Sequence, residues 1–327
     1  MPLLPEVEAF LKACAEELPR DPGSDTVEEM RRITETREAR FDVEAPAMGS
    51  EFRRRIPVAG GTIDIEIYVP SSLSKRPAGV LIFLHGGGWV LCSLASHANM
   101  CRYLCAKAGV IGVNVGYRLA PEHLFPTALD DAAAALDWVA ANIDAFGGDP
   151  SHIVVAGDSA GGGLAAVLAQ RAARGEAPRL AAQALFYPSV GMGVRERFES
   201  WRRLGDGGYG VNSDECEWMM GLYLSSGEQR TDPRFSPILA EDLEDAPPTL
   251  IITAEYDPLL DEGRAYADRL RAAGGAVEYH CFLGAIHAFM SMAGGMPVGY
   301  AALDLAADFI TGHANAPAAD GAGGRAR

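Results

Sequence analysis

Six segments between residues 80 and 283 are mostly apolar, which is the pattern of strands buried on both faces of a sheet. In chain order they read VLIFLH, VIGVNV, IVVAG, AQALFY, TLIITA and VEYHCFL. Helical patterns separate them, following Ser93, Thr127, Ser159, Asp261 and Pro297. This alternation predicts an α/β fold, with a mostly parallel central sheet flanked by helices and right-handed crossovers.

Two segments ahead of these strands have a different pattern. FRRRIPV and TIDIEIYVP alternate apolar and polar residues on either side of the pair Gly60-Gly61, which predicts an antiparallel hairpin of edge strands. Residues 1–48, before the hairpin, carry apolar residues at helical spacing until Pro46 breaks the pattern. A helical N-terminal segment is therefore expected.

The alternation of strands and helices stops between Tyr187 and Thr249. This stretch contains an apolar set at helical spacing, made of Trp218, Met219, Leu222 and Tyr223, and it is expected to lie over one end of the sheet. The end of the chain has no core-forming side chains, which predicts a disordered tail. The expected bounds are 1–48 for the N-terminal segment, 49–188 and 248–313 for the two parts of the core, 189–247 for the insertion, and 314–327 for the tail.

Charge and composition narrow the classes of partner. The chain has 327 residues, 48% of them hydrophobic, and a formal net charge of −16, which would repel nucleic acid and anionic membrane surfaces. No run of about 18 apolar residues occurs, and the first residues are acidic, so neither membrane insertion nor a signal peptide is expected. We therefore expect a cytoplasmic protein, and the sequence leaves homo-oligomer formation open.

Motifs for metals and cofactors are missing from the sequence. The six cysteines form no CxxC pair and match no zinc spacing, so they are interpreted as core residues or free thiols. HExxH and P-loop motifs are absent, and GDGGYG at 205–210 fits GxGxxG only formally, because no strand precedes it. Neither a metal nor a cofactor is expected.

Ser159 lies where a strand pattern gives way to a helix pattern, in VVAGDSAGGG. Gly157 and Gly161 flank it at two residues on either side, as GxSxG, because strand and helix pass closely at such a turn. The turn would expose the hydroxyl as a nucleophile, next to the free N–H groups and positive potential of a helix N-terminus. The alternative is that Ser159 only caps the helix.

Two further turns follow predicted strands. HGGG at 85–88 can direct bare backbone N–H groups at an anionic oxygen. The alternative is that these residues form an ordinary flexible glycine-rich loop. Asp257 follows TLIITA and could orient an imidazole, or it could cap the next helix ahead of Pro258. The competing carboxylates in this region are Glu255, Asp261 and Glu262.

His287 follows the last predicted strand, in GAIHAF. Packed structural roles are expected for His97, His123, His152 and His280, and His313 near the end of the chain carries no visible signal. The chain order Ser159, Asp257, His287, with each residue after a different strand, is the one expected of an α/β-hydrolase. All three loops would open at the carboxyl edge of the sheet, where such folds bind ligands.

HGGGW, YRLAPEHLFP, GDSAGG, DPLLDEG and IHAF together resemble the bacterial hormone-sensitive-lipase-type carboxylesterases over roughly residues 50–310. The resemblance implies an α/β-hydrolase core with a helical cap, formed by the N-terminal segment and the insertion. It implies Ser159 as nucleophile, His287 as general base and acid, and Asp257 as its orienting carboxylate. The oxyanion hole would consist of the backbone N–H groups of Gly87, Gly88 and Ala160.

Two positions depart from that family. It often has Asp before the Tyr of YRLAPE and Gly after the His of IHGF, whereas this chain has Gly116 and Ala288. Neither change removes a catalytic group. Gly116 could loosen the packing below the site and Ala288 could narrow the space beside His287, so both bear on substrate range and stability.

The expected substrate is a small-molecule ester with a short or medium acyl chain, an expectation that rests on the resemblance. Candidate pocket residues are Trp89, Tyr209, Trp218, Met219 and Leu222, although an ordinary buried core would explain the last three equally well. The same three catalytic groups could also serve an amidase, a peptidase or an acyltransferase. A non-catalytic ligand receptor is the remaining alternative, and the complete Ser, His and Asp set argues against it.

Overall fold

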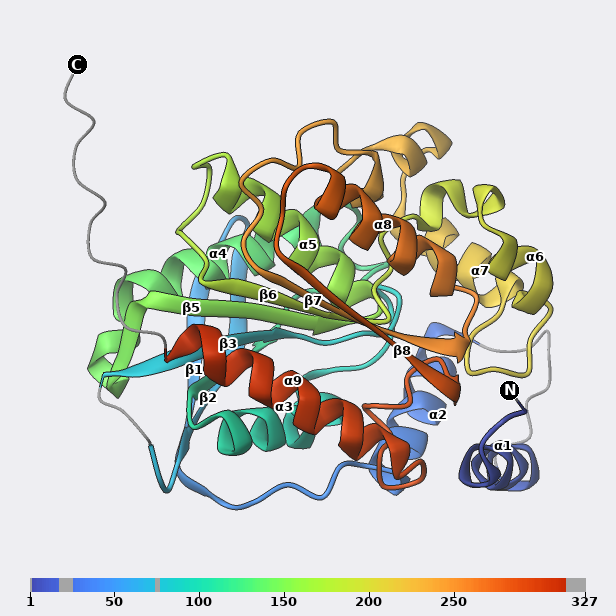
Figure 1. The fold of residues 1–327 in the computed structure, drawn as a ribbon, viewed down its shortest axis with the longest axis horizontal. Coiled ribbons are helices and arrows are strands. Elements are labelled where there is room, and N and C mark those ends of the chain that lie inside the picture. The colour runs from blue at the N-terminus through green and yellow to red at the C-terminus, as the bar shows by residue number, and fades with distance from the viewer. Residues whose placement is uncertain (1, 18–25, 74–76, 316–327) are drawn as a thin grey trace.

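The computed structural model describes residues 2–17, 26–73 and 77–315, and at its centre lies an eight-stranded sheet (Figure 1). The strands are β1 (Met48–Val58), β2 (Gly61–Pro70), β3 (Ala78–Leu84), β4 (Ile111–Gly116), β5 (Gly148–Asp158), β6 (Ala182–Phe186), β7 (Thr249–Tyr256) and β8 (Val277–Ile286). Their order is β1-β2-β4-β3-β5-β6-β7-β8. β2 is antiparallel to β1 and β4, and all other neighbours are parallel, which confirms the predicted fold class.

Helices cover both faces of the sheet (Figure 1). On one face lie α3 (Leu94–Ala108) and α9 (Val298–Ala314), and on the other lie α4 (Thr127–Asn142), α5 (Ala160–Ala173) and α8 (Leu260–Ala272). A short 3-10 helix, η1 (Ile143–Phe146), joins α4 to β5. These α-helices follow the strands at the places where the sequence predicted helices.

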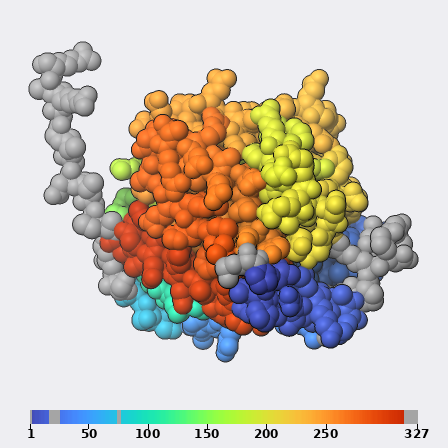
Figure 2. Space-filling model, turned by 45° about the vertical axis from the view of Figure 1, so that its right-hand side comes forward, coloured from blue at the N-terminus to red at the C-terminus, as the bar shows by residue number. Residues whose placement is uncertain are grey.

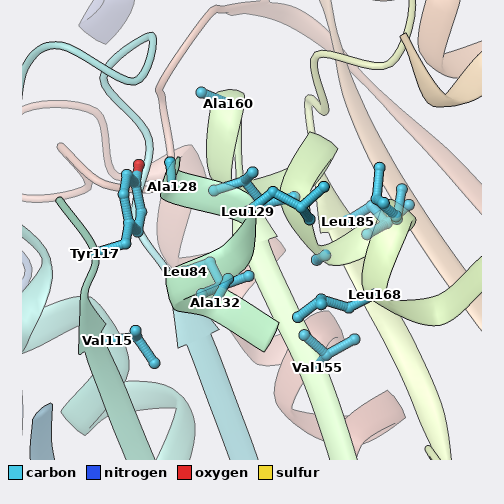
Figure 3. Packing of buried hydrophobic residues seen from close by; sticks show 14 of the residues in the cluster. Leu84, Val115, Tyr117, Ala128, Leu129, Ala132, Val155, Ala160, Leu168 and Leu185 are labelled. Carbon is cyan, nitrogen blue, oxygen red and sulfur yellow. The ribbon is translucent and has the colours of Figure 1, made fainter. Parts of the chain in front are cut away.

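Each face of the sheet has its own hydrophobic core, because successive strand residues point to opposite sides. Figure 3 shows the core on the α4 and α5 side, where Leu84, Val155 and Leu185 of the strands meet helix residues such as Leu129 and Leu168. Burial on both faces explains why these strands are apolar throughout. The arrangement fixes the carboxyl ends of β3, β5, β7 and β8 along one edge.

The predicted hairpin is confirmed, with Val58 paired to Gly61 across the turn, but only β1 is an edge strand, because β2 also pairs with β4. The prediction for the last strand was wrong at its end, since β8 continues beyond Leu283 to Ile286. It was also wrong on burial, because β8 lies at the edge of the sheet and its residues from Val277 to Leu283 are only partly buried or exposed. Its pairing with β7 shifts between Ala254 and Tyr256 and then resumes at Tyr256 and Ile286. The irregularity accommodates Gly284, which has a φ of +72°, without ending the strand.

The N-terminal segment contains two helices, α1 (Pro5–Glu17) and α2 (Val27–Arg40). The insertion contains α6 (Glu199–Leu204), α7 (Ser213–Tyr223) and the 3-10 helices η2 (Met192–Arg197), η3 (Gly227–Thr231) and η4 (Pro237–Leu239). Arg31 of α2 donates hydrogen bonds of 2.8 Å to the carbonyls of Val90 and Ala120, in the loops after β3 and β4. Figure 2 shows the blue N-terminal segment adjoining the yellow insertion on one face of the molecule.

The predicted tail begins one residue too early, because Ala314 is the buried last residue of α9. A Cβ at Gly79 would lie 2.3 Å from the Ala314 carbonyl oxygen, so this helix end packs directly on β3. Residues 316–327 of the tail lie outside the described residues. Within the described ranges, no helix has both the length and the apolar character needed to cross a bilayer.

Candidate active site

Ser159 occupies a strained turn between β5 and α5, with a φ of +51° and a ψ of −119°. Such values are uncommon outside glycine and cluster at functional sites. A Cβ at Gly161 would lie 2.0 Å from the Leu84 carbonyl oxygen, and one at Gly157 would lie 2.4 Å from the Gly161 carbonyl oxygen. The flanking glycines are therefore required by close backbone packing, and the Ser159 side chain makes no capping hydrogen bond to α5.

Three residues from different parts of the chain form a hydrogen-bonded series. His287 Nε2 lies 3.0 Å from Ser159 Oγ, and His287 Nδ1 lies 2.8 Å from Asp257 Oδ2. Because a carboxylate only accepts hydrogen bonds, Nδ1 carries the proton, and Nε2 of the neutral ring is left to accept one from the hydroxyl. The other oxygen of Asp257 accepts a bond of 2.8 Å from the backbone N–H of Leu259, which fixes the carboxylate.

Both the backbone and the ring of His287 make contacts that fix its position. Its backbone N–H donates to the Tyr209 carbonyl at 3.1 Å, and the Tyr187 ring meets it edge-on with centroids 5.0 Å apart. Burial by itself would lower the pKa of His287, but the charge of Asp257 and the hydrogen bond to it outweigh that effect and raise the pKa above 6.5. Asp257, the partner that causes the increase, is fully buried.

The other carboxylates near Asp257 serve different groups. Glu255 accepts a bond from the Gly284 N–H at 2.8 Å, and Asp261 accepts one from the Ser200 N–H at 2.7 Å. Glu262 is buried and accepts bonds from the N–H groups of Val190 and Gly191 and from the Trp201 indole. Asp257 is therefore the carboxylate that the structure brings to His287.

The HGGG turn lies beside Ser159 and is tied to the serine strand. The Gly86 N–H donates to Asp158 Oδ1 at 2.8 Å, and the Tyr117 hydroxyl donates to the His85 carbonyl at 2.7 Å. Gly87 and Gly88 have φ values of +100° and +60°, which favour glycine. Both glycines border the same cavity as Ser159.

The cavity that Ser159 lines is small, with a volume of about 90 Å³. From the predicted pocket set, Trp218 and Met219 line it. The other members lie elsewhere: Trp89 stacks on Tyr223 at 5.0 Å, Tyr209 packs on Tyr256 at 5.3 Å, and Leu222 packs against the core. The prediction placed four apolar residues of the insertion together, whereas only Trp218 and Met219 of these four line the cavity.

Sequence reasoning missed a group of polar residues that lines this cavity. His97, for which a structural role was expected, lines it together with Asp158, and so do Thr34, Arg37 and Glu38 of α2. His97 Nε2 lies 3.3 Å from Asp158 Oδ1. The sequence carried one usable signal, since Thr34 and Glu38 share a helix face with the apolar Met30.

The remaining predictions concern histidines, cysteines and metals. His152 pairs with Asp149 at 2.9 Å and His313 lies 2.9 Å from the Phe309 carbonyl, away from the cavity. All six cysteines are free thiols. Among the described residues, no group of His, Cys, Asp and Glu side chains is arranged to hold a metal ion.

The two departures from the family motifs have clear structural settings. A Cβ at Gly116 would lie 2.9 Å from both the Leu94 side chain and the Asp64 carbonyl oxygen, so a larger residue there requires these neighbours to move. Ala288 has a φ of +62°, a conformation that favours glycine. Ala288 also borders the cavity next to His287.

Residues 81–291 match the protein family described as alpha/beta hydrolase fold. The chain is 43% identical over 237 residues to the ethyl acetate hydrolase of Pseudomonas putida, covering 71% of this chain and 73% of that protein. It is 32% identical over 290 residues to an arylesterase of Saccharolobus solfataricus, covering 89% and 93%. A solved structure of a hyperthermophilic esterase from Pyrobaculum calidifontis matches with a TM-score of 0.86 at 35% identity, covering 97% and 100% of the two chains.

Proposed function

The chain belongs to the α/β-hydrolase fold family and is a carboxylic ester hydrolase, and we propose that it cleaves short- to medium-chain esters through Ser159, His287 and Asp257. The observation that carries this proposal is the unbroken series of hydrogen bonds from Ser159 Oγ through His287 to Asp257. The three side chains have the geometry of a nucleophile, its base and the group that orients the base.

Each residue has a definite step in the proposed reaction. His287 Nε2 removes the hydroxyl proton as Ser159 Oγ attacks the ester carbonyl, and the imidazolium then gives that proton to the leaving alcohol. Asp257 stabilises the imidazolium without taking its proton. Water attacks the acyl-enzyme by the same route and releases the acid.

The oxyanion formed in each attack requires donors that are already in place. The backbone N–H groups of Gly87, Gly88 and Ala160 are proposed for this role, with Ala160 at the positive N-terminus of α5. The hydrogen bond from Gly86 to Asp158 supports this assignment, because it anchors the turn that carries two of the donors. Each such donor typically contributes about 100- to 1000-fold in rate.

The proposed cap consists of the N-terminal segment and the insertion. Residues of α2 and α7 line the same cavity as Ser159, which supports this division of the chain. The small volume of the cavity suits a small ester, and the name of the related ethyl acetate hydrolase contains an ester with a short acyl group.

The test uses a series of p-nitrophenyl esters from acetate to laurate, run beside a p-nitroanilide. We expect the highest kcat/KM for short and medium acyl esters, and little cleavage of the anilide. Ser159→Ala is expected to lose at least about a thousandfold in kcat and to escape labelling by an organophosphate. Ser151→Ala, which changes an exposed serine of the same strand, serves as the matched control.

Retained activity in Ser159→Ala contradicts the assignment of the nucleophile. Equal cleavage of the anilide and the ester favours an amidase, and preference for laurate contradicts the proposed chain length.

A further inference from the structure

One face of α2 brings polar side chains to the cavity that holds Ser159. Met30, Thr34, Arg37 and Glu38 follow one another at helical spacing and all line this cavity. Thr34 and Glu38 are each only 3% exposed. Helix faces that turn inward are normally apolar, so this polar face calls for a specific explanation.

Three polar atoms on this face have no hydrogen-bond partner among the residues that the structure describes. They are Thr34 Oγ1, Arg37 Nε and Glu38 Oε2. Buried polar atoms in proteins nearly always have a partner, so each of these three atoms calls for an explanation. Since all three residues border the cavity, a molecule bound there can reach them.

The charges around this face suit an uncharged group. Burial raises the pKa of Glu38 above 4.5 and the nearby Asp158 adds to the increase, while His97 and Arg37 oppose it. The Asp158 carboxylate is itself paired with His97. A cation entering the cavity would meet Arg37 and His97, and an anion would meet Asp158 and Glu38.

The hydrogen-bonding capacity of the three residues is mixed. Arg37 Nε can only donate, Glu38 Oε2 can accept, and the Thr34 hydroxyl can both donate and accept. A hydroxyl group, which also donates and accepts, can satisfy two of these atoms at once. An alkyl chain would leave all of them unsatisfied.

We propose that Thr34, Arg37 and Glu38 form a polar subsite that selects esters carrying a hydroxyl group away from the scissile carbonyl. This inference rests on the proposed function, because the subsite opens into the cavity of Ser159. It gives the preferred substrate class as hydroxy esters, with the hydroxyl on either the acid or the alcohol part.

The experiment compares pairs of esters that differ by one hydroxyl. The acid arm uses p-nitrophenyl butyrate and p-nitrophenyl 3-hydroxybutyrate. The alcohol arm uses butyl butyrate and 4-hydroxybutyl butyrate, followed by acid release at constant pH. The measured quantity is the ratio of kcat/KM for the hydroxylated ester to that for the plain ester. We expect a ratio of about 3 to 10 in at least one arm, as one net hydrogen bond provides.

Two matched pairs of variants test whether this ratio depends on α2. Thr34→Val and Glu38→Leu are expected to lower the ratio by about 3- to 10-fold. Glu38→Gln keeps an oxygen that can accept a hydrogen bond at this position, so this variant should retain the wild-type ratio. Thr36→Val and Glu35→Leu change exposed residues of the same helix and should leave the ratio at its wild-type value. Labelling of Ser159 by an organophosphate counts the intact sites in each preparation.

The outcomes separate the inference from the function on which it rests. No hydrolysis of either ester and no labelling of Ser159 would contradict the proposed function. Hydrolysis of both esters with a ratio near one in both arms overturns the subsite. So does a wild-type preference that Thr34→Val and Glu38→Leu leave intact. Where a variant does not fold, a wild-type ratio near one in both arms still overturns the subsite, and a ratio that the remaining folded variant lowers still supports it.

Discussion

His97 and Asp158 form a buried pair directly below Ser159, with His97 Nε2 only 3.3 Å from Asp158 Oδ1. The same carboxylate oxygen accepts the Gly86 N–H at 2.8 Å, so imidazole, carboxylate and HGGG turn are joined in series. His97 Nδ1 lies 2.9 Å from the Ser96 hydroxyl, which orients the ring from its other side. The pair thus connects the start of α3 to both segments that surround the nucleophile.

The stabilisation contributed by His97 should disappear as the pH rises. Burial lowers the pKa of His97, but Asp158, together with Glu38 and Asp42, raises it from 6.5 to about 8. The folded protein therefore holds a proton that the unfolded chain has lost. This stabilisation is complete below pH 6.5 and is lost as the pH rises through about 8. The difference in pKa corresponds to about 2 kcal/mol.

Urea unfolding of the wild type and His97→Gln at about pH 6 and pH 9 measures this effect. The difference in unfolding free energy between the two proteins should be about 2 kcal/mol larger at the lower pH. His123→Gln, at a partly exposed position, is measured in parallel as the control for replacing a histidine elsewhere in the chain. If the difference in unfolding free energy between the two proteins is equal at both pH values, Asp158 does not raise the pKa of His97.

Asp257→Asn should move the acid side of the activity profile to lower pH. His287 must be neutral to act as a base, and Asp257 raises its pKa above 6.5, so activity should fall as the pH drops through that raised value. Without the carboxylate the pKa falls, and the midpoint of kcat/KM moves down. The kcat itself should drop about 10⁴-fold, because the imidazole loses its correct tautomer.

The profile is measured with p-nitrophenyl butyrate over the stable pH range of both proteins. Asp261→Asn is the matched control, since Asp261 bonds to the Ser200 N–H rather than to His287. The assignment of Asp257 fails if its variant keeps the wild-type midpoint and rate.

The residues proposed to react were predictable from sequence because each has a local signature. The turn at Ser159 requires glycine on both sides, as the contacts of Gly157 and Gly161 demonstrate, and such a requirement is visible in a single chain. Asp257 and His287 directly follow strands, and parallel strands bring their carboxyl ends to one edge. The pattern of buried strands therefore also predicted which loops would meet.

The polar face of α2 could not be assigned to the cavity from the sequence. Its orientation depends on long-range contacts, such as the hydrogen bonds of Arg31 to Val90 and Ala120, and no local pattern encodes them. The same limit applies to Trp89, which an aromatic contact with Tyr223 of the insertion holds in the core. The periodicity of apolar residues identified the helices, whereas long-range packing determined which of their residues line the cavity.

Met219→Ala should shift substrate preference toward longer acyl chains. Met219 stands over the HGGG turn so closely that a Cβ at Gly88 would lie 2.0 Å from its sulfur, and it lines the cavity. Shortening this side chain opens space for added methylene groups, each worth about 0.8 kcal/mol or roughly fourfold in kcat/KM. The ratio of kcat/KM for p-nitrophenyl octanoate to that for butyrate should therefore rise at least about fourfold.

Leu222→Ala provides the control, because Leu222 belongs to the same helix but does not line this cavity. Its ratio should stay at the wild-type value even if stability falls. An unchanged ratio in Met219→Ala would show that the acyl chain lies elsewhere.

Ala288→Gly should stabilise the protein. Ala288 has a φ of +62°, where its Cβ costs about 1–2 kcal/mol, whereas glycine adopts this conformation freely. Glycine gives back about 0.4–1 kcal/mol through the greater freedom of the unfolded chain. The net gain in unfolding free energy should be about 0.5–1 kcal/mol, measured by urea unfolding.

Ala301→Gly, at an exposed position inside α9, should instead destabilise by about 0.5–1 kcal/mol. Opposite signs for the two substitutions would establish that backbone strain beside His287 is the cause, since the loss of one methyl group is common to both. A loss of stability in Ala288→Gly would mean that contacts of its methyl group in the cavity wall outweigh the strain.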